Sequence, residues 1–316
     1  MENTFVSSMS GFYAIHNYNG YLESFPEDAE NKFYENELKD YDEDEIRGFI
    51  NICCDQNPDS CDRFTDFFKE TGHSILPLNI WNKVKDIPVL FYYDEGLGKS
   101  LQTAITPAVM IEWKLFTKID YLFHLYQQTA LNFDDIFFSE ELANSYTNAF
   151  TDLAVWSSTK IILPPPDLIK FLPLGGLVNS QGLQASTVAK SFWLLCEYGH
   201  ILMKHYYSAT GASHTEMSES STYIFSVKGE ISADIFAIEA MSNTSGESLE
   251  NIICCIGILL RFIAMRDELN QNNEVFERRH KRVQRWESIK VFAGSRENGS
   301  AKIKQVDAIF NFLQNR

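Results

Sequence analysis

Cys196 and His200 are the pair of residues in this sequence whose types and spacing most directly indicate chemistry. Side chains four residues apart lie one turn apart on a helix, so both can point at a shared atom. Cysteine and histidine are established zinc ligands, with Zn–S bonds of about 2.3 Å and Zn–N bonds of about 2.0–2.1 Å. Three interpretations are open at this point: a metal site, a cysteine nucleophile with His200 as its base, or two core residues of a buried helix.

A single helix over residues 185–207 is predicted to carry this pair. Its apolar side chains recur at alternating spacings of four and three, which is typical of one buried helical stripe. The stripe comprises Val188, Phe192, Leu195, Gly199, Leu202 and Tyr206. A glycine inside a helix costs about 1 kcal/mol relative to alanine. Gly199 therefore predicts that another backbone passes close to this part of the helix.

A second helix is predicted over residues 229–241, and it carries two carboxylates on one face. Its buried stripe consists of Ile231, Ile235 and Ile238. Glu230 and Asp234 lie four apart on a different face, where like charges repel by about 0.2–0.5 kcal/mol. The repulsion is relieved if one carboxylate meets a cation and the other meets a histidine N–H. The pattern therefore indicates that the second helix contributes to a polar site.

Taken together, the two helices resemble a known family. The first reads Cys196-Glu197-Tyr-Gly-His200 with a further histidine at position 205, and the second reads Glu230-Ile-Ser-Ala-Asp234-Ile-Phe-Ala. Except for the cysteine, this resembles the HExxH helix and the later E-x-x-A-D helix of gluzincin zinc metallopeptidases, particularly the M48-like and ImmA/IrrE-like groups. The resemblance covers residues 148–290. Its weaker parts are Asn148-Ala149-Phe150, the strand predicted after it, and the positions Arg279, His280 and Arg285.

The resemblance implies a Zn²⁺ site and a hydrolytic mechanism. Cys196, His200 and Glu230 would be the metal ligands, and Glu197 would be the general base that deprotonates a zinc-bound water. Asp234 would orient His200 from behind the ligands. His205 is assigned the same kind of supporting position, although a histidine at a helix end also complements the helix dipole.

The resemblance also implies a protein or peptide substrate. The strand predicted over residues 155–162 would bind an extended peptide by adding it as a further strand. Tyr223 or His280 would stabilise the oxyanion. The sequence leaves the identity of the substrate open.

Cysteine in place of the first histidine leaves three outcomes open. In the first case the thiolate of Cys196 binds zinc together with His200 and Glu230. A thiolate adds negative charge, so the metal would acidify its water less and activity would be low. Alternatively, the metal site is lost and the fold persists as a non-catalytic interaction or regulatory module. In the third case the match is accidental, and Cys196, Glu197 and His200 are ordinary residues of a buried helix.

Other elements are predicted from local patterns. Residues 89–93 read as a strand, and the following Gly98-Lys99-Ser100 lacks the upstream glycine of a phosphate-binding loop. Helices are predicted over 109–128 and over 139–150, the latter capped by Ser139. A β-rich segment at 154–163 and a buried helix at 252–265 complete the set.

These elements predict a mainly helical α+β fold with two regions. Residues 131–316 would form a zincin-like metallopeptidase domain with a small edge β-sheet. Residues 1–130 would form an acidic N-terminal accessory region, because positions 27–46 carry ten acids against Lys32 and Lys39. Such a run is most often a solvated helix face or a loose connector.

Composition limits the partners and the compartment. The formal net charge of -16 argues against nucleic acid, whose phosphates would be repelled. The most apolar run, 252–265, contains Arg261 and is shorter than the roughly 20 residues of a membrane span. The N-terminus lacks the pattern of a signal peptide, and the six cysteines do not resemble a disulfide framework. We therefore expect a cytoplasmic protein without membrane or nucleic acid partners, and the sequence leaves its oligomeric state open.

Overall fold

The structure is a computed structural model of the chain. It describes residues 70–87, 89–92, 98–102, 107–116, 118–158, 164, 165, 168, 171, 180–203, 207, 208, 227–269, 273–294 and 301–315. The acidic run, His205 and Tyr223 lie outside these residues, and so does the side chain of His280. Helices dominate the described part of the chain, as predicted.

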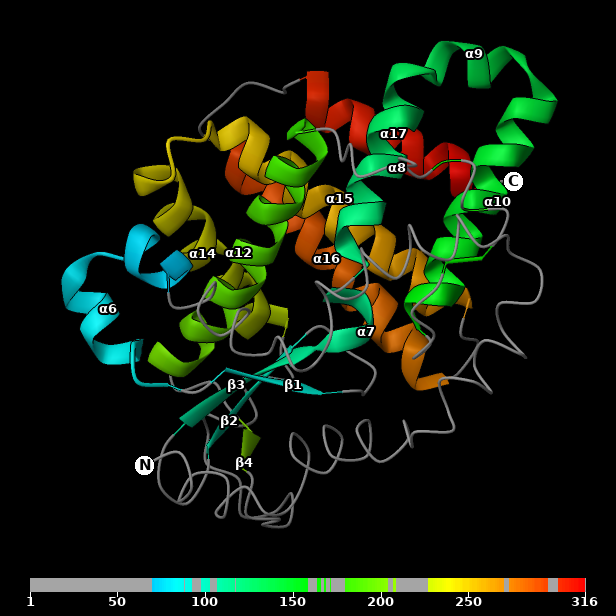
Figure 1. Cartoon of the computed structure of the whole chain (residues 1–316). Coiled ribbons are helices and arrows are strands. Elements are labelled where there is room, and N and C mark those ends of the chain that lie inside the picture. The colour runs from blue at the N-terminus through cyan, green and yellow to red at the C-terminus, as the bar shows by residue number, and fades with distance from the viewer. Residues whose placement is uncertain are drawn as a thin grey trace, which may run out of the picture.

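Helix α12 (Ser180–Leu202) lies at the centre of the fold and carries Cys196, Glu197 and His200. It contacts α14 (Val227–Thr244), α15 (Leu249–Leu269) and α8 (Ile119–Leu131), which surround it in Figure 1. The helix was predicted to continue to residue 207, and this is wrong. Tyr207 begins the short strand β4 (Tyr207–Ser208), which pairs with β2 of the sheet.

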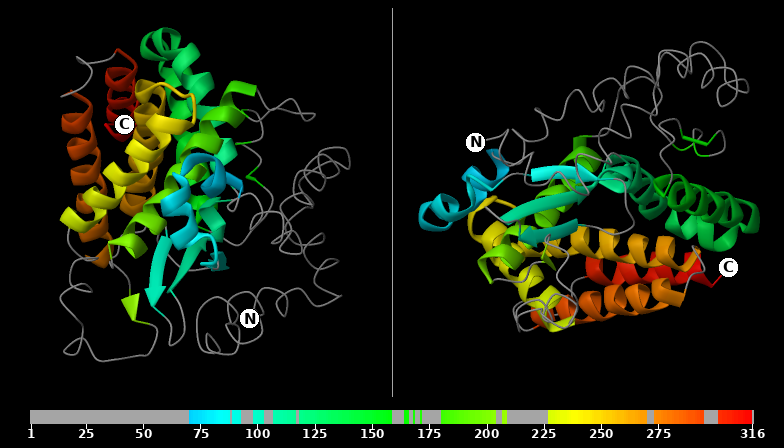
Figure 2. Two further views of the ribbon diagram at one scale, coloured as in Figure 1. Left: turned by 90° about the vertical axis from the view of Figure 1, so that its left-hand side faces the viewer. Right: turned by 90° about the horizontal axis from the view of Figure 1, so that it is seen from below.

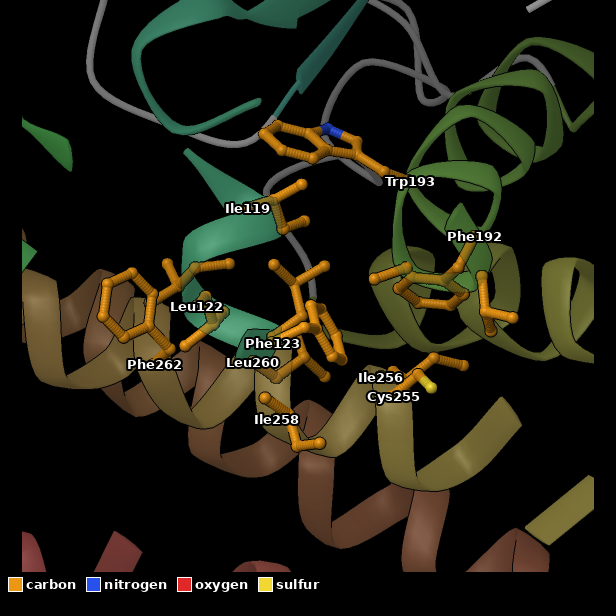
Figure 3. Close-up of a cluster of buried hydrophobic side chains, with 14 of the residues drawn as sticks. Ile119, Leu122, Phe123, Phe192, Trp193, Cys255, Ile256, Ile258, Leu260 and Phe262 are labelled. Carbon is orange, nitrogen blue, oxygen red and sulfur yellow. The ribbon is translucent and has the colours of Figure 1, made fainter. Parts of the chain in front are cut away.

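Helix α15 forms the core. Every residue from Ile252 to Asp267 is buried, which confirms the buried helix predicted over 252–265. Its side chains meet those of α8 and α12 in Figure 3, where Phe262 and Leu260 lie near Leu122, and Cys255 and Ile256 near Phe192. A helix that is apolar on all sides is stable in water only when other elements enclose it. Among the described residues, every helix is too short or too polar to span a bilayer.

Helices α16 (Asn273–Gly294) and α17 (Ala301–Gln314) pack on α15 and form a layer with it, visible in both views of Figure 2. A Cβ atom added at Gly257 would lie 2.5 Å from a ring carbon of Trp286, so α15 and α16 approach closely there. Helix α10 (Glu140–Ser157) packs against α15, and α9 (Phe133–Phe138) joins α10 to α8.

A small mixed sheet lies beside the central helix α12. Its order is β1 (Val89–Tyr92), β3 (Pro107–Glu112), β2 (Gly98–Gln102) and β4. Strand β3 runs parallel to β1 and antiparallel to β2, and α12 contacts both β2 and β3. The strand predicted over 89–93 is confirmed.

The helix predicted over 109–128 is wrong in its first part. Residues 107–112 form β3, followed by the short helix α7 (Trp113–Phe116) and then by α8. The β-branched and apolar residues of β3 pair on both sides, and Val109 and Ile111 are fully buried. Apolar runs of this length are ambiguous between strand and helix by periodicity alone.

Two further predictions concern the segment that forms helix α10. The Ser139 cap is confirmed, because its hydroxyl accepts a hydrogen bond from the backbone N–H of Leu142. The strand predicted over 154–163 is wrong at its start, because residues 154–157 form the last turn of α10 and Trp156 packs there against Tyr121. The peptide-binding role predicted for residues 155–162 loses this support.

The predicted division at residue 130 falls within α8. Side chains from both sides of it, such as Ile119, Leu122 and Ile136, belong to the same hydrophobic core. Helix α6 (Leu78–Val84) also contributes Trp81 and Val84 to that core. The division into two regions stays a prediction.

Candidate functional site

The crossing of α12 and α14 brings the predicted site residues together. A Cβ atom at Gly199 would lie 2.9 Å from Cδ1 of Phe236 and 3.4 Å from Cα of Ala233. The α14 backbone therefore passes Gly199 closely, as the glycine predicted. This approach places Cys196, His200, Glu230 and Asp234 at one interface, and Figure 1 shows the two helices side by side.

Arg285 of α16 joins the two carboxylates of α14. Its Nε donates to Asp234 Oδ2 at 2.8 Å, and its Nη2 donates to Asp234 Oδ1 at 2.5 Å. Its Nη1 lies 2.6 Å from Glu230 Oε2. Asp234 is fully buried and the Arg285 side chain is only 4% exposed. A two-pronged arginine–carboxylate pair of this kind is among the strongest polar interactions in a protein.

The charges of this group shift one another's pKa values. Burial alone would raise the pKa of Glu230, but the positive charges of Arg285 and other nearby cations outweigh it and lower the pKa. Burial alone would lower the pKa of Arg285, but Asp234 and Glu230 outweigh it and raise the pKa. Both groups therefore stay charged around neutral pH.

Cys196 takes part in this group as a thiol. Its Sγ donates a hydrogen bond to Asp234 Oδ1 at 3.1 Å. Burial raises the pKa of the Cys196 thiol well above its ordinary value, and the negative charge of Asp234 raises it further. A thiol in such surroundings is a poor nucleophile and a poor metal ligand, because both roles require the thiolate.

Glu197 and His200 complete the buried polar set. Both side chains are buried in α12, at 6% and 4% exposure. Nε2 of His200 faces Oε1 of Glu230 at 3.8 Å. Of the three predicted ligands, His200 and Glu230 therefore face each other, whereas Cys196 is directed to Asp234. Asp234 was predicted to orient His200, and its two oxygens are engaged by Arg285 and Cys196.

The residues as they lie do not fit a zinc ion. One predicted ligand is a protonated thiol bound to Asp234, and another is paired with the guanidinium of Arg285. Within the part of the chain that the structure describes, no three or more His, Cys, Asp or Glu side chains are grouped so that they could hold a metal. We therefore derive no hydrolytic step from this arrangement, and the roles predicted for Glu197 and for zinc stay predictions.

Arg285 is the central residue of this group, and it had been predicted only as part of a weak His/Arg element. Two signals pointed to it. Glu230 and Asp234 need a cation on a buried face, and α16 carries Arg282 and Arg285 one turn apart beside the apolar Trp286. Burial and the nearby charge of Arg285 lower the pKa of Arg282. Which of several arginines meets the carboxylates is a tertiary contact that no local pattern specifies.

Comparison with known proteins gave no further assignment: the chain matches no protein-family model, no curated protein and no solved structure. The likeness to gluzincins therefore rests on the sequence patterns alone, chiefly on the residues of α12 and α14.

Proposed function

We propose that this chain is a non-catalytic interaction module built on a metallopeptidase-like helix pair. The observation that carries the proposal is the guanidinium of Arg285, which binds both Glu230 and Asp234. A fixed protein cation then neutralises Glu230, the carboxylate predicted to bind a metal ion, together with Asp234 behind it. The helix pair is held together without any cofactor.

The energetics of burial support this role for Arg285. An isolated buried charge costs several kcal/mol, and only a partner with good geometry compensates it. Here one guanidinium meets two carboxylates, and the thiol of Cys196 donates to the one that is fully buried. This arrangement favours a structural role for Cys196, because its thiol is held as a hydrogen-bond donor to Asp234 and not as a free thiolate.

An exposed aromatic surface supports the interaction part of the proposal. Leu131 at the end of α8 is 77% exposed, and Phe137 and Phe138 at the end of α9 are 62% and 87% exposed. Asp134 and Asp135 flank them, and positions 119–158 contain no lysine or arginine. Exposed aromatics with one sign of charge are typical of protein-binding surfaces. We infer a protein partner that presents apolar and basic side chains to this tip.

Metal analysis of the purified full-length chain tests the proposal against the zinc peptidase hypothesis. The proposal predicts far less than one zinc per chain after dialysis, and no thermal stabilisation by added zinc. The comparison variants are Cys196→Ala, which removes a predicted ligand, and Cys254→Ala, which removes a buried cysteine elsewhere. We expect both variants to match the wild type in zinc content.

One zinc per chain that is lost in Cys196→Ala but kept in Cys254→Ala would contradict the proposal. In that case Glu197→Gln should abolish cleavage of peptide substrates while it leaves the zinc in place. This second result would establish the hydrolytic mechanism that the sequence pattern predicts.

A further inference from the structure

A cavity separate from the charged group lies further toward the N-terminal end of α12. It has a volume of about 560 Å³, within the range of small-molecule sites. It opens to the surface and lies between the helical residues 70–75, the first half of α12, and the end of α14 with the turn that follows it. Its lining consists of Thr71, Ser74, Ile75, Gln184, Thr187, Val188, Ser191, Met241, Thr244, Ser245 and Glu247.

Three hydroxyl groups of this lining, those of Ser74, Thr244 and Ser245, already donate their hydrogens within the protein. Ser74 donates to the carbonyl of Thr71 at 3.0 Å, and Ser245 donates to the carbonyl of Met241 at 2.7 Å. Thr244 donates to the carbonyl of Ile75 at 2.8 Å. A hydroxyl has one hydrogen and two lone pairs, so these groups can only accept hydrogen bonds from a ligand.

The charge of the lining also favours a ligand that donates hydrogen bonds. Glu247 is the one charged side chain among the lining residues. Its Oε1 accepts a hydrogen bond from Gln184, and its Oε2 accepts one from Asn251 at 3.4 Å, so the carboxylate is held in position. Among the described residues of the lining there is no lysine, arginine or histidine, which disfavours phosphate or carboxylate ligands. A carboxylate with surrounding acceptors is complementary to an ammonium group, which brings only donors.

The other side of the cavity is apolar. Ile75, Val188 and Met241 line it, and all three are buried. A ligand that fits would carry an apolar body between these side chains and a positive group toward Glu247. We propose that this cavity binds a small primary amine with an apolar body. The inference goes beyond the interaction module proposed above and uses none of the residues of the charged group.

Three probes with one chain and different head groups test this proposal on the full-length protein: n-hexylamine, 1-hexanol and hexanoate. Binding is measured by isothermal titration or by ligand-observed NMR. We expect hexylamine to bind about tenfold more tightly than hexanol, since a hydrogen bond to a charged group exceeds a neutral one. Hexanoate should bind most weakly. Glu247→Gln should remove the preference for the amine, and Glu268→Gln, at the far end of α15, should keep it.

A second pair of variants tests the location. Thr187→Trp adds an indole at an exposed lining position and should abolish binding of all three probes. Asn243→Trp adds the same group at an exposed α14 position outside the lining and should leave binding unchanged. The proposal is overturned if no probe binds, if the three head groups bind equally, or if Thr187→Trp binds hexylamine as the wild type does. None of these results depends on whether the chain holds zinc.

Discussion

Two helix crossings in this protein use a glycine for close approach and differ in everything around it. Where α15 meets α16, Gly257 faces the indole ring of Trp286 in an apolar layer. Where α12 meets α14, Gly199 faces Ala233 and Phe236 beside a buried charged group. Helix α16 serves both crossings with consecutive residues, since Arg285 binds the carboxylates of α14 and Trp286 packs on α15.

The comparison shows how one helix can hold its neighbours by two kinds of force. The packing at Gly257 depends on shape, because the Trp286 ring fills the space that a Cβ would need, while its Nε1 donates to Asp307 Oδ1 at 2.7 Å. The pairing at Arg285 depends on charge, and removal of one partner leaves the others buried and uncompensated. The two crossings should therefore respond differently to mutation and to pH.

The largest effect is expected from Arg285→Met. The substitution keeps much of the side-chain volume but leaves the fully buried Asp234 and the partly buried Glu230 without this cation. Breaking a buried pair in this way costs about 3–5 kcal/mol. Urea denaturation of the wild type and the variant measures the difference, with Arg285→Lys as a control that keeps the charge and loses the two-pronged geometry.

Adding Asp234→Asn and Glu230→Gln to Arg285→Met should recover part of the loss, because the buried charges are then gone. A cost below about 1 kcal/mol for the single variant would mean that the pairing contributes little. The charged crossing would then be no different in kind from the apolar one.

The second largest loss of stability is expected from Gly257→Ala, which tests the apolar crossing. The added methyl group would lie 2.5–2.9 Å from three atoms of the Trp286 ring, which is fully buried. Overpacking of this kind costs about 1–3 kcal/mol, and the higher helix propensity of alanine offsets about 1 kcal/mol of it. Gly199→Ala should cost less, because its closest contact is the half-buried and movable ring of Phe236. Thermal denaturation of both variants measures the order, and a larger loss for Gly199→Ala would contradict it.

The pH dependence of stability should also differ between the two crossings. The folded pKa of Glu230 lies below its ordinary value of about 4.5. Its ionised form therefore stabilises the fold above that pH, and this contribution is lost as the pH falls through the folded pKa. Unfolding free energies between pH 7 and pH 3 should fall less steeply in Glu230→Gln than in the wild type, whereas Gly257→Ala should keep the wild-type slope. Parallel slopes for the wild type and Glu230→Gln would contradict the pairing.

Local patterns predicted the helices that carry the site and part of their contacts. The alternation of four and three around Gly199, the face shared by Glu230 and Asp234, and the Ser139 cap are all local signals. The apolar run at 107–112 was wrongly predicted to be helical from residue 109, because a strand paired on both sides and a buried helix have similar composition. The end of α12 was extended too far because Tyr206 continues its spacing, whereas the next residue, Tyr207, pairs with β2. The role of Arg285 depends on a contact between segments about fifty residues apart, which no window of sequence contains.

The smallest effect is expected from Phe138→Ser at the exposed tip of α9. The side chain is 87% exposed, so its removal should change the free energy of unfolding by less than about 0.5 kcal/mol. Its effect should instead fall on partner binding. A loss comparable to that of Gly257→Ala, measured by the same thermal denaturation, would mean that this ring is structural and not part of an interaction surface.

The most direct test of the central claim is a crystal structure grown with zinc, with anomalous data collected at the zinc absorption edge. We predict that the guanidinium of Arg285 lies against Glu230 and Asp234, with no anomalous peak between Cys196, His200 and Glu230. A peak at about 2.0–2.3 Å from Cys196 Sγ, a ring nitrogen of His200 and an oxygen of Glu230, with Arg285 turned away, would contradict the claim and restore the zinc peptidase hypothesis.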